Sequence, residues 1–462
     1  MTNTPWLGDA CSLVDAFRSG QRSPVEELEA TLTAIDDSNL NAFCDTDPER
    51  AMAAAQQADV HQPFGGVPLG IKALTPVEGW IDDECSLVFE GRRADHTALH
   101  IERLLAAGMV PVGRCNASEF GGLNVSVNKV YGVTHNPHQQ GRTAGGSSGG
   151  SASAVAGGLV TIASGGAGGG SLRIPAGFCG LVGMKGTAGR IPRGPRTEIH
   201  PMTVVTGPMA RSVRDVCRWY DVTCGFDMRD PYSLPKHEEW ERDLGTFDLR
   251  GKRAVISPDL GSAQLSPEVE SRVREGAELL AKDAGLVLVD LPVELPGLGY
   301  EWAMANLCQL LRTCGDRWPE CRDDLTLEIA FGLTLAEQNF DLKMMANVEA
   351  QRTVANENMA ALFDEVDFVI SATNPDVAFG ADVYLNQQVH GRAVGPENNG
   401  ALTIPANIVG NPSISVPVEC YEGLPIGMQI MGRHHEDQLL LDLARIVERE
   451  RPWPLVAHGA PI

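Results

Sequence analysis

One stretch decides the fold of this chain, and it reads GRTAGGSSGGSASAVAGGLVTIASGGAGGGSLRIPAGFCGLVGMKGT over residues 141–187. Residues 141–190 hold 17 of the 50 glycines, far more than uniform scatter would place there. Glycine is costly in regular structure, and its common use is to expose backbone or to permit unusual φ/ψ. The sequence between the glycines predicts a helix over 151–158 and a strand over 159–164. We therefore expect two Gly/Ser loops around a buried strand, which is typical of a functional loop system.

Composition places the chain among ordinary globular proteins. Hydrophobic residues make up 43% of the 462 residues and charged residues 21%, which excludes disorder, collagen and coiled coil as the main architecture. The formal net charge is −23. Because a surface that acidic repels phosphate backbones, nucleic acid is not expected as a partner.

The sequence carries no pattern typical of secretion or membrane insertion. The 11 cysteines are scattered from Cys11 to Cys420 without a Cys-x-x-Cys pair, as in proteins with reduced thiols. No apolar run precedes Arg18, the first basic residue, so no signal peptide is expected. Residues 143–172 are uncharged but consist mostly of Gly, Ser and Ala, which is unlike a membrane helix. We expect a cytoplasmic protein that does not bind membranes.

Hydrophobic periodicity predicts alternating helices and strands. Ser-Pro-Val-Glu at residues 23–26 is typical of a helix start, with an N-cap, a proline in the first turn and a capping-box acid. Strands are expected at 66–73, 109–113, 252–258, 287–291, 366–372, 413–418 and 427–431, and helices at 51–60, 96–108, 267–284 and 436–450. Residues 302–356 are expected to be helical, with one apolar stripe made of Ala303, Leu307, Leu310, Leu311 and Cys314.

This alternation predicts an α/β fold in layers. The sequence shows no internal repeat and no clear linker. We therefore expect residues 1–462 to form a single domain with a helical insertion at about 300–356.

Two other functions could use a glycine-rich region of this kind. GGSSGG at 145–150 contains Gly-x-Ser-x-Gly twice, centred on Ser147 and on Ser148. The nucleophile elbow of α/β-hydrolases must follow a strand directly, but HNPHQQGRTA at 135–144 is expected to be a polar loop. A nucleotide-binding loop is disfavoured because Gly-Lys-Ser/Thr does not follow the glycines and GGAGGGS does not satisfy G-x-G-x-x-G.

No group of residues predicts a metal site. His96 and His100 are spaced as in a zinc helix, but Thr97 replaces the glutamate of His-Glu-x-x-His and no third ligand suggests itself. We expect both to be solvated helix residues. The other candidates are expected at the surface or in helix packing: His434, His435, Cys308, Cys314 and Cys321.

Several motifs, taken in order, resemble the amidase signature family. The quoted stretch resembles its signature segment, and GVPLGIK at 66–72 resembles its lysine strand. GVTHNP at 132–137 resembles the lead-in to the signature, while GNPSISVP at 410–417 and GLPIGMQIMG at 423–432 resemble C-terminal segments. The likeness is strong over about 64–190, recognisable over 365–450 and absent between them. It implies a mixed β-sheet core flanked by helices, with a variable helical region for the substrate.

The resemblance also implies a Ser–cis-Ser–Lys triad. By motif position Lys72 matches the lysine, Ser147 the bridging serine after a cis peptide, and Ser171 the nucleophile, while Ser148 is only a neighbour. A serine hydroxyl is a weak nucleophile until a base takes its proton, and neither loop contains a histidine. Burial lowers the pKa of a catalytic lysine towards roughly 7–8, so a neutral Lys72 would serve as the base.

The glycines before Ser171 would supply the oxyanion hole. Backbone N–H groups of Gly168, Gly169 and Gly170 are expected to stabilise the charge that develops on the substrate carbonyl. No metal and no cofactor is implied. Lys185 and Arg173 match positions with structural roles, Arg173 as a loop anchor.

The chain departs from the family pattern at four places. Ala167 and Gly168 stand where the family usually has Asp followed by Thr or Ile. Ala73 replaces an Asp after the lysine, and Ala144 replaces a Pro before GGSSGG. The loss of two nearby carboxylates should favour neutral Lys72, since a carboxylate would stabilise the ammonium.

The sequence therefore predicts a serine amidohydrolase that acts through an acyl-enzyme on Ser171. One alternative is the subunit of an amidotransferase complex, although such subunits generally keep the Asp-Thr that is missing here. A second is a non-catalytic binding protein with the same fold. A third is an esterase of the α/β-hydrolase type that uses Ser148 and a histidine such as His390.

The substrate is predicted only as a class. The middle segment supplies apolar residues for either a helical core or the wall of a pocket: Trp302, Met304, Trp318, Phe331, Phe340, Met344 and Met345. The Gly-Gly-Gly-Ser variant resembles family members that act on anilides, nylon oligomers and urethanes. We expect a small, largely uncharged amide or anilide, with carbamates as additional substrates, and a monomer or homodimer.

Overall fold

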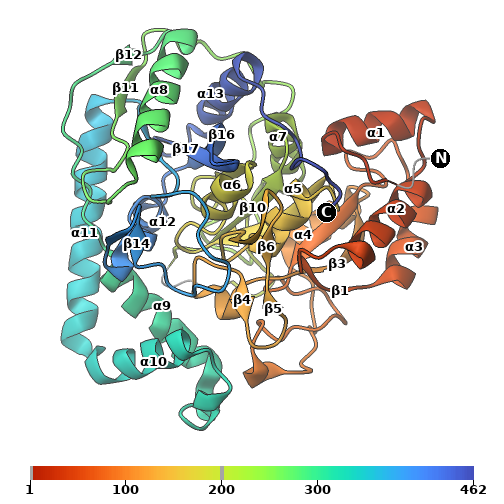
Figure 1. Cartoon of the computed structure of the whole chain (residues 1–462), viewed down its shortest axis with the longest axis horizontal. Coiled ribbons are helices and arrows are strands. Elements are labelled where there is room, and N and C mark those ends of the chain that lie inside the picture. Colours follow the sequence, from red (N-terminus) through yellow and green to blue (C-terminus); the bar gives the residue numbers. More distant parts are fainter. Residues whose placement is uncertain (1–3, 198–201) are drawn as a thin grey trace.

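A mixed β-sheet runs through the whole molecule (Figure 1). The computed structural model describes residues 4–197 and 202–462. Within these ranges the sheet has 11 strands, in the order β1 (Phe43–Thr46), β3 (Val110–Cys115), β2 (Pro68–Lys72), β8 (Ile162–Ala167), β10 (Val205–Ala210), β9 (Val182–Lys185), β16 (Ser413–Tyr421), β17 (Leu424–Gly432), β13 (Phe368–Ala372), β11 (Arg253–Ile256) and β12 (Val287–Leu288). β2 pairs in parallel with β3 and β8, whereas β8, β10, β9 and β16 pair antiparallel in turn. The predicted mixed sheet is confirmed.

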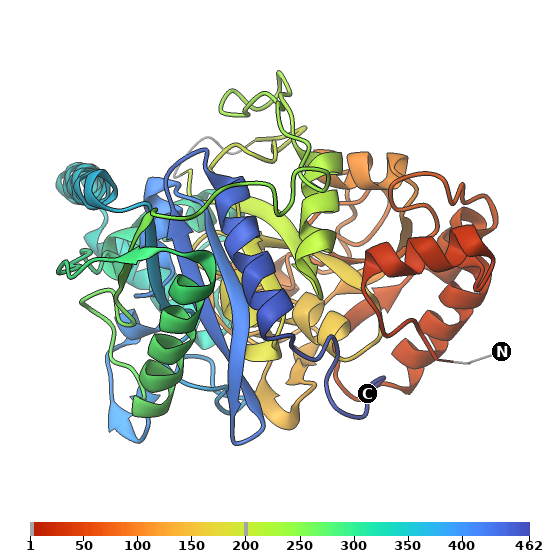
Figure 2. The same ribbon diagram turned by 90° about the horizontal axis from the view of Figure 1, so that it is seen from above.

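Helices cover both faces of this sheet. Neighbouring residues on a strand point to opposite faces, so Ile162 and Ala163 of β8 belong to different apolar clusters. The Ile162 cluster contains α1 (Ala10–Ser19), α4 (Leu99–Ala106), α7 (Val213–Thr223), α8 (Pro267–Ala284) and α13 (Asp437–Glu450). The Ala163 cluster contains α5 (Gly149–Ala156) and α6 (Arg173–Cys179). Seen from above, α8 and α13 lie alongside the blue strands β16 and β17 (Figure 2).

The predicted helix start near the N-terminus is confirmed. α2 (Pro24–Asp37) begins after Ser23, whose hydroxyl accepts a hydrogen bond of 3.2 Å from the Glu26 backbone N–H. The Glu26 carboxylate accepts one of 2.8 Å from the Ser23 backbone N–H, which completes the capping box. α3 (Pro48–Gln56) starts three residues before the predicted 51–60, because Asp47 caps it.

The strands predicted at 159–164 and 287–291 are misplaced or too long. β8 covers Ile162–Ala167 instead of 159–164, because α5 ends at Ala156, capped by Gly157, and the chain turns before the strand begins. The strand then continues through its glycines, which pair with β10. Of the strand predicted at 287–291, only Val287–Leu288 pairs, at the exposed edge of the sheet.

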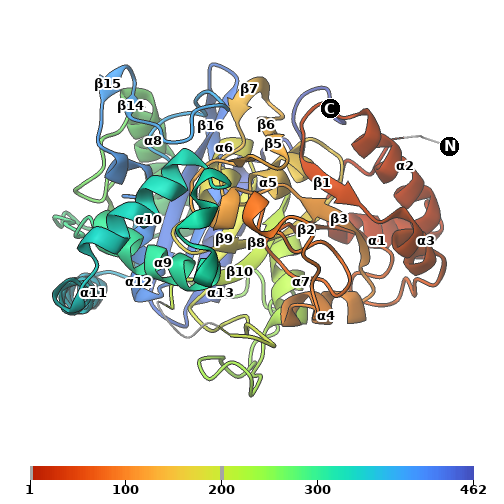
Figure 3. The same cartoon turned by 90° about the horizontal axis from the view of Figure 1, so that it is seen from below.

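The predicted helical region is three helices with breaks between them. These are α9 (Gly299–Cys314), α10 (Leu327–Asn339) and α11 (Leu342–Glu365), separated by the short 3₁₀ helices η3 (Gly315–Arg317) and η4 (Glu320–Asp323) and by a turn. In the predicted stripe, Leu310 and Cys314 are buried and Leu307 and Leu311 are partly buried, all in one cluster with α10. Seen from below, α9 and α10 lie side by side and α9 also packs with α11 (Figure 3).

The remaining elements are short. They are the 3₁₀ helices η1 (Leu87–Phe89), η2 (Glu119–Gly121) and η5 (Pro396–Asn399), the helix α12 (Ile404–Val409), and the strand pairs β4 (Val127–Asn128) with β5 (Gly132–Val133), β6 (His135–Asn136) with β7 (Gln139–Thr143), and β14 (Gln388–Val389) with β15 (Arg392–Ala393). The polar loop predicted at 135–144 is therefore a small hairpin, which lies outside the central sheet. Among the described helices, none has both the length and the apolar character needed to cross a membrane.

Candidate active site

Lys72 lies at the end of β2 with its amine inside the protein. Only 4% of the residue is exposed. Its Nζ donates hydrogen bonds to Ser147 Oγ at 2.8 Å and to the carbonyl of Gly166 at 3.0 Å. Burial lowers the pKa of Lys72 from 10.5 to about 7, because the ammonium form loses its hydration. The amine is therefore neutral in a large fraction of molecules near pH 7.

The two neighbouring serines before α5 point in different directions. The Gly146–Ser147 peptide is cis, and the Ser147 hydroxyl meets Lys72. Ser148 Oγ instead contacts the backbone of Gly166, donating to its carbonyl at 3.2 Å and accepting from its N–H at 3.3 Å. Ser126 supports the turn by donating to the Ser147 carbonyl and accepting from the Gly149 N–H.

Ser171 stands at the end of the glycine run, between β8 and α6. It is 8% exposed, and its hydroxyl forms no hydrogen bond with the described residues, Ser147 included. The two serine loops are nevertheless adjacent. A Cβ built on Gly165 would lie 2.6 Å from the side chain of Leu172, which follows Ser171, and 3.3 Å from the Oγ of Ser148, which follows Ser147. Both loops therefore contact the same glycine.

The carbonyls of the glycine run are held by side chains. The indole N–H of Trp302 donates to the Gly168 carbonyl at 2.9 Å. Asn407 Nδ2 donates to the Ala167 carbonyl at 2.9 Å, and Thr403 Oγ1 donates to the Gly169 carbonyl at 2.6 Å. In contrast, the backbone N–H groups of residues 168–171 donate no hydrogen bond to any described residue.

Arg173 anchors the loop, as predicted. Its guanidinium is completely buried and donates to Gln429 Oε1 at 2.7 Å and to the Thr403 carbonyl at 2.9 Å, and also contacts the Asn407 side chain. Lys185 is also buried and donates to the Gly186 carbonyl at 2.9 Å. Trp302 stood out in the sequence only as one of several apolar residues, and no sequence signal marked Thr403, Asn407 or Gln429.

A turn from η2 lies against the Ser147 hydroxyl. A Cβ on Gly121 would stand 3.3 Å from Ser147 Oγ and 3.2 Å from the Leu74 side chain. Glu119, which begins this turn, is fully buried. Its carboxylate accepts hydrogen bonds from the Ser86 hydroxyl at 2.6 Å and from the backbone N–H and hydroxyl of Thr326 at 2.8 and 2.7 Å. Glu119 therefore joins the serine turn to the start of α10.

The residues predicted to line a pocket behave differently from one another. Met304 and Trp318 are buried, whereas Phe331 and Met345 are exposed. Trp302 contacts the glycine run; the other two of the seven, Phe340 and Met344, are half-buried.

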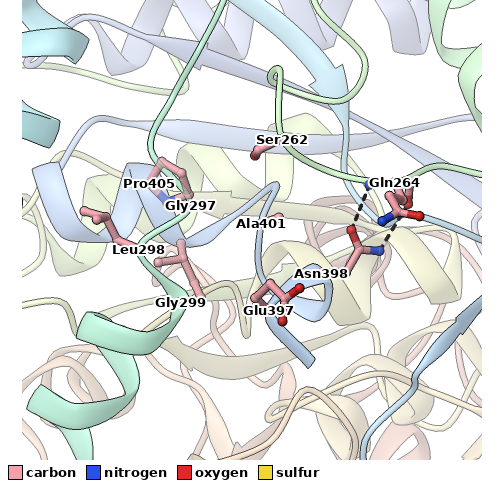
Figure 4. Close-up of a pocket in the computed structure, with 10 residues that line it drawn as sticks. Ser262, Gln264, Gly297, Leu298, Gly299, Glu397, Asn398, Ala401 and Pro405 are labelled. Atoms are coloured by element: carbon pink, nitrogen blue, oxygen red, sulfur yellow. Dashed lines mark hydrogen bonds between the residues drawn. The ribbon is translucent and has the colours of Figure 1, made fainter. Parts of the chain in front are cut away.

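A pocket lies between the start of α9 and the segment 397–405 (Figure 4). Gln264 and Asn398 lie together at one side of it, joined by two hydrogen bonds. Leu298, Ile404 and Pro405 line its apolar side. Ile404 separates the pocket from the glycine run, since its Cγ1 would lie 3.3 Å from a Cβ on Gly169.

The histidines and cysteines considered as metal ligands lie in different surroundings. No cluster of three or more His, Cys, Asp or Glu suited to a metal occurs in the part of the chain that the structure describes. His434, His435 and Cys308 are exposed, while Cys314 and Cys321 pack in the cluster of α9 and α10. The prediction of two solvated helix residues is wrong. His100 in α4 is buried, and burial lowers its pKa to about 4, while His96 is half-buried and lies before the helix begins.

A protein-family model described as Amidase matches residues 26–441. This chain belongs to the amidase signature family. It is an amidase-signature hydrolase with the mixed sheet that the motifs predicted.

The relatives of this amidase carry several names. It is 31% identical to a glutamyl-tRNA(Gln) amidotransferase subunit from Chloroflexus aggregans, over 95% of each chain. Among solved structures, a bacterial aryl acylamidase shares 25% identity with a TM-score of 0.88 over 97% of each chain. A 6-aminohexanoate cyclic dimer hydrolase shares 27% identity with a TM-score of 0.89 over 99% of each chain.

Two departures of this amidase from the family pattern affect the surroundings of Lys72. Ala73 is buried in an apolar cluster with Cys85 and Ala117, so no carboxylate follows the lysine. Ala167 is buried and offers only its carbonyl, to Asn407. The sequence attributed a neutral amine to these missing carboxylates; in the structure it is burial that lowers the pKa of Lys72, while the Glu84 carboxylate acts to raise it.

The esterase alternative offered His390 as one possible partner for Ser148. His390 is half-exposed, and its Nδ1 lies 3.8 Å from the Glu268 carboxylate. Ser148 is fully buried, and its hydroxyl donates a hydrogen bond to the Gly166 carbonyl. The structure thus disfavours a nucleophile elbow centred on Ser148.

Proposed function

We propose that this amidase hydrolyses small, largely uncharged amides and anilides, with carbamates as further substrates, through an acyl-enzyme on Ser171. The observation that carries the proposal is the hydrogen bond of 2.8 Å between a buried Lys72 amine and Ser147. An amine whose pKa is lowered to about 7 is a suitable base for acyl transfer near neutral pH.

In the proposed mechanism Ser171 Oγ attacks the carbonyl carbon. Its proton passes to Ser147, whose own proton passes to Lys72. The substrate oxygen becomes negative and accepts hydrogen bonds from N–H groups of residues 168–171. These groups have no partner among the described residues, which supports this role.

Collapse of the tetrahedral intermediate breaks the C–N bond. Lys72 returns a proton through Ser147 to the leaving nitrogen, so the amine departs neutral. A water molecule then attacks the acyl carbonyl and gives its proton to the same pair. The acid product leaves, and the Ser171 hydroxyl is restored.

The substrate class is inferred from the surroundings of the glycine run and from relatives. Trp302 and Ile404 border Gly169, and both are largely apolar. A Cβ on Gly168 would meet Val204 at 3.6 Å, an ordinary van der Waals contact, so space for one methyl group lies beside this loop, and we propose that the second oxygen of a carbamate uses it. The aryl acylamidase and the 6-aminohexanoate cyclic dimer hydrolase named above support an amide or anilide.

The chain is proposed to work as one unit, as a monomer or homodimer, in the cytoplasm. Strands from residues 43–46 to 424–432 join one sheet, which supports a single amidase domain. All 11 cysteines are unpaired, which supports a reducing compartment. No cofactor enters the proposed reaction.

A panel of substrates tests the proposal. Purified chain, without partners, is incubated with a 4-nitroanilide, an arylacetamide and an aryl carbamate, and the released amine is measured by chromatography. We expect turnover with the wild-type chain and none with Ser171→Ala. Turnover that survives in Ser171→Ala would contradict the proposed nucleophile.

A second candidate is a component of an amidotransferase complex, favoured by the 31% identity to such proteins. It predicts no hydrolysis of the panel by the isolated chain and activity only with partner proteins and charged tRNA. Binding of the panel without turnover or covalent labelling would instead favour a non-catalytic binding protein.

A further inference from the structure

We propose that Trp302 positions the oxyanion loop and so couples the helical insertion to the chemistry at Ser171. This rests on the proposed function. Trp302 lies in the first turn of α9, and its indole N–H donates to the Gly168 carbonyl at 2.9 Å. A Cβ on Gly169 would lie 2.7 Å from Trp302 Cζ2, so the ring also lies flush against the loop.

The hydrogen bond from Trp302 to the Gly168 carbonyl also sets the direction of the next N–H group. In a planar trans peptide, the carbonyl of one residue and the N–H of the next point in opposite directions. Because Trp302 fixes the Gly168 carbonyl, it also fixes the direction of the Gly169 N–H. That N–H has no partner among the described residues and is aimed away from the indole.

The neighbouring peptides are fixed in the same way from a different element. Asn407 holds the Ala167 carbonyl and thereby orients the Gly168 N–H. Thr403 holds the Gly169 carbonyl and thereby orients the Gly170 N–H. Both residues are 1% exposed, whereas Trp302 is only partly buried. Trp302 is thus the member of this set that belongs to the helical insertion.

The helical insertion contacts both the turn at Ser147 and the glycine run before Ser171. α9 packs with Phe120, next to the Gly121 turn at Ser147, and at its start it holds the Gly168 carbonyl. A substrate group that rests on the insertion would therefore sit on the same helix that aims an oxyanion donor. Loss of the indole N–H should weaken transition-state stabilisation rather than substrate binding.

Trp302→Phe is the decisive variant, because it keeps an aromatic ring and removes the donor. We expect kcat to fall about tenfold or more while KM stays within about twofold, since loss of a whole oxyanion donor costs about 10²–10³ in kcat. The loss should be larger for a carbamate than for an activated ester, because a carbamate carbonyl needs more oxyanion stabilisation. The midpoint of the pH profile should not move.

Trp318→Phe is the matched control. Trp318 belongs to the same insertion, and its indole N–H donates to the Glu337 carboxylate at 3.4 Å, away from the glycine run. The kcat of Trp318→Phe should therefore stay near that of the wild type. A second pair keeps the test independent of how Trp302→Phe folds. Thr403→Val should lose kcat, and Thr403→Ser, which retains the hydroxyl, should recover most of it.

The outcomes separate this inference from the proposed function. If wild-type chain is labelled at Ser171 and turns over the panel, but Trp302→Phe keeps its kcat on the carbamate, the positioning role is wrong. An equal loss for carbamate and activated ester, or a change in KM alone, would also overturn it. If the wild-type chain neither turns over the panel nor is labelled, the proposed function itself fails.

Discussion

Lowering the pH should switch this amidase off by protonating Lys72. Burial lowers the pKa of the amine to about 7, and its base form is the neutral one. With that pKa about half of the molecules are neutral at pH 7 and about 1% at pH 5, because each pH unit below the pKa lowers the neutral fraction about tenfold. We therefore expect kcat/KM to rise with pH through a midpoint near 7 and to fall about 100-fold from its plateau to pH 5.

The assay is kcat/KM for an uncharged nitroanilide from pH 5 to 9 at constant ionic strength, with circular dichroism to confirm that the chain stays folded. The midpoint should shift strongly with temperature, since ionisation of an amine has a larger enthalpy than that of a histidine. Lys72→Arg should be inactive at every pH, because arginine stays charged. A flat profile, a midpoint near 10 or an active Lys72→Arg enzyme would refute the role of a neutral lysine.

Three further predictions concern the loops around the serines. Ser147→Ala should lower kcat by about 10³-fold or more, as for other members of a catalytic unit, whereas Ser148→Ala should cost less than about tenfold; comparable losses would argue against a bridging Ser147. Gly170→Ala should destabilise the chain in thermal melts, since its φ is +147° and a Cβ would lie 2.3 Å from the Thr403 hydroxyl, while Gly168→Ala should melt like the wild type. Glu119→Ala should lower the free energy of unfolding in urea by about 2–4 kcal/mol, because three buried donors lose their acceptor. Glu119→Gln retains a carbonyl for Thr326 and should lower it less. Equal losses for the two variants would contradict this role of the carboxylate.

The order of motifs predicted the fold and part of the candidate site. Lys72 and Ser147 are 75 residues apart, yet their match to known motifs was enough to predict that they meet, and they do. The mixed sheet followed from the same resemblance. The prediction for Ser148, as a neighbour outside the triad, agrees with its hydrogen bonds to Gly166.

The side chains that hold the glycine run could not be predicted from the sequence. Trp302, Thr403 and Asn407 act on backbone carbonyls 134, 234 and 240 residues away. Backbone acceptors are the same in every residue, so no motif marks such a contact. His100 was misjudged because the helix was expected to begin at residue 96. α4 begins only at Leu99, so His96 lies before the helix and the i, i+4 spacing carries no information about its buried face.

Covalent labelling of Ser171 tests the central claim most directly. The folded chain is treated with a fluorophosphonate, and the modified peptide is located by mass spectrometry while residual activity is followed. We predict one adduct, on Ser171, in step with the loss of activity and absent from Ser171→Ala. An adduct on Ser148, or complete inactivation without modification of Ser171, would contradict the account.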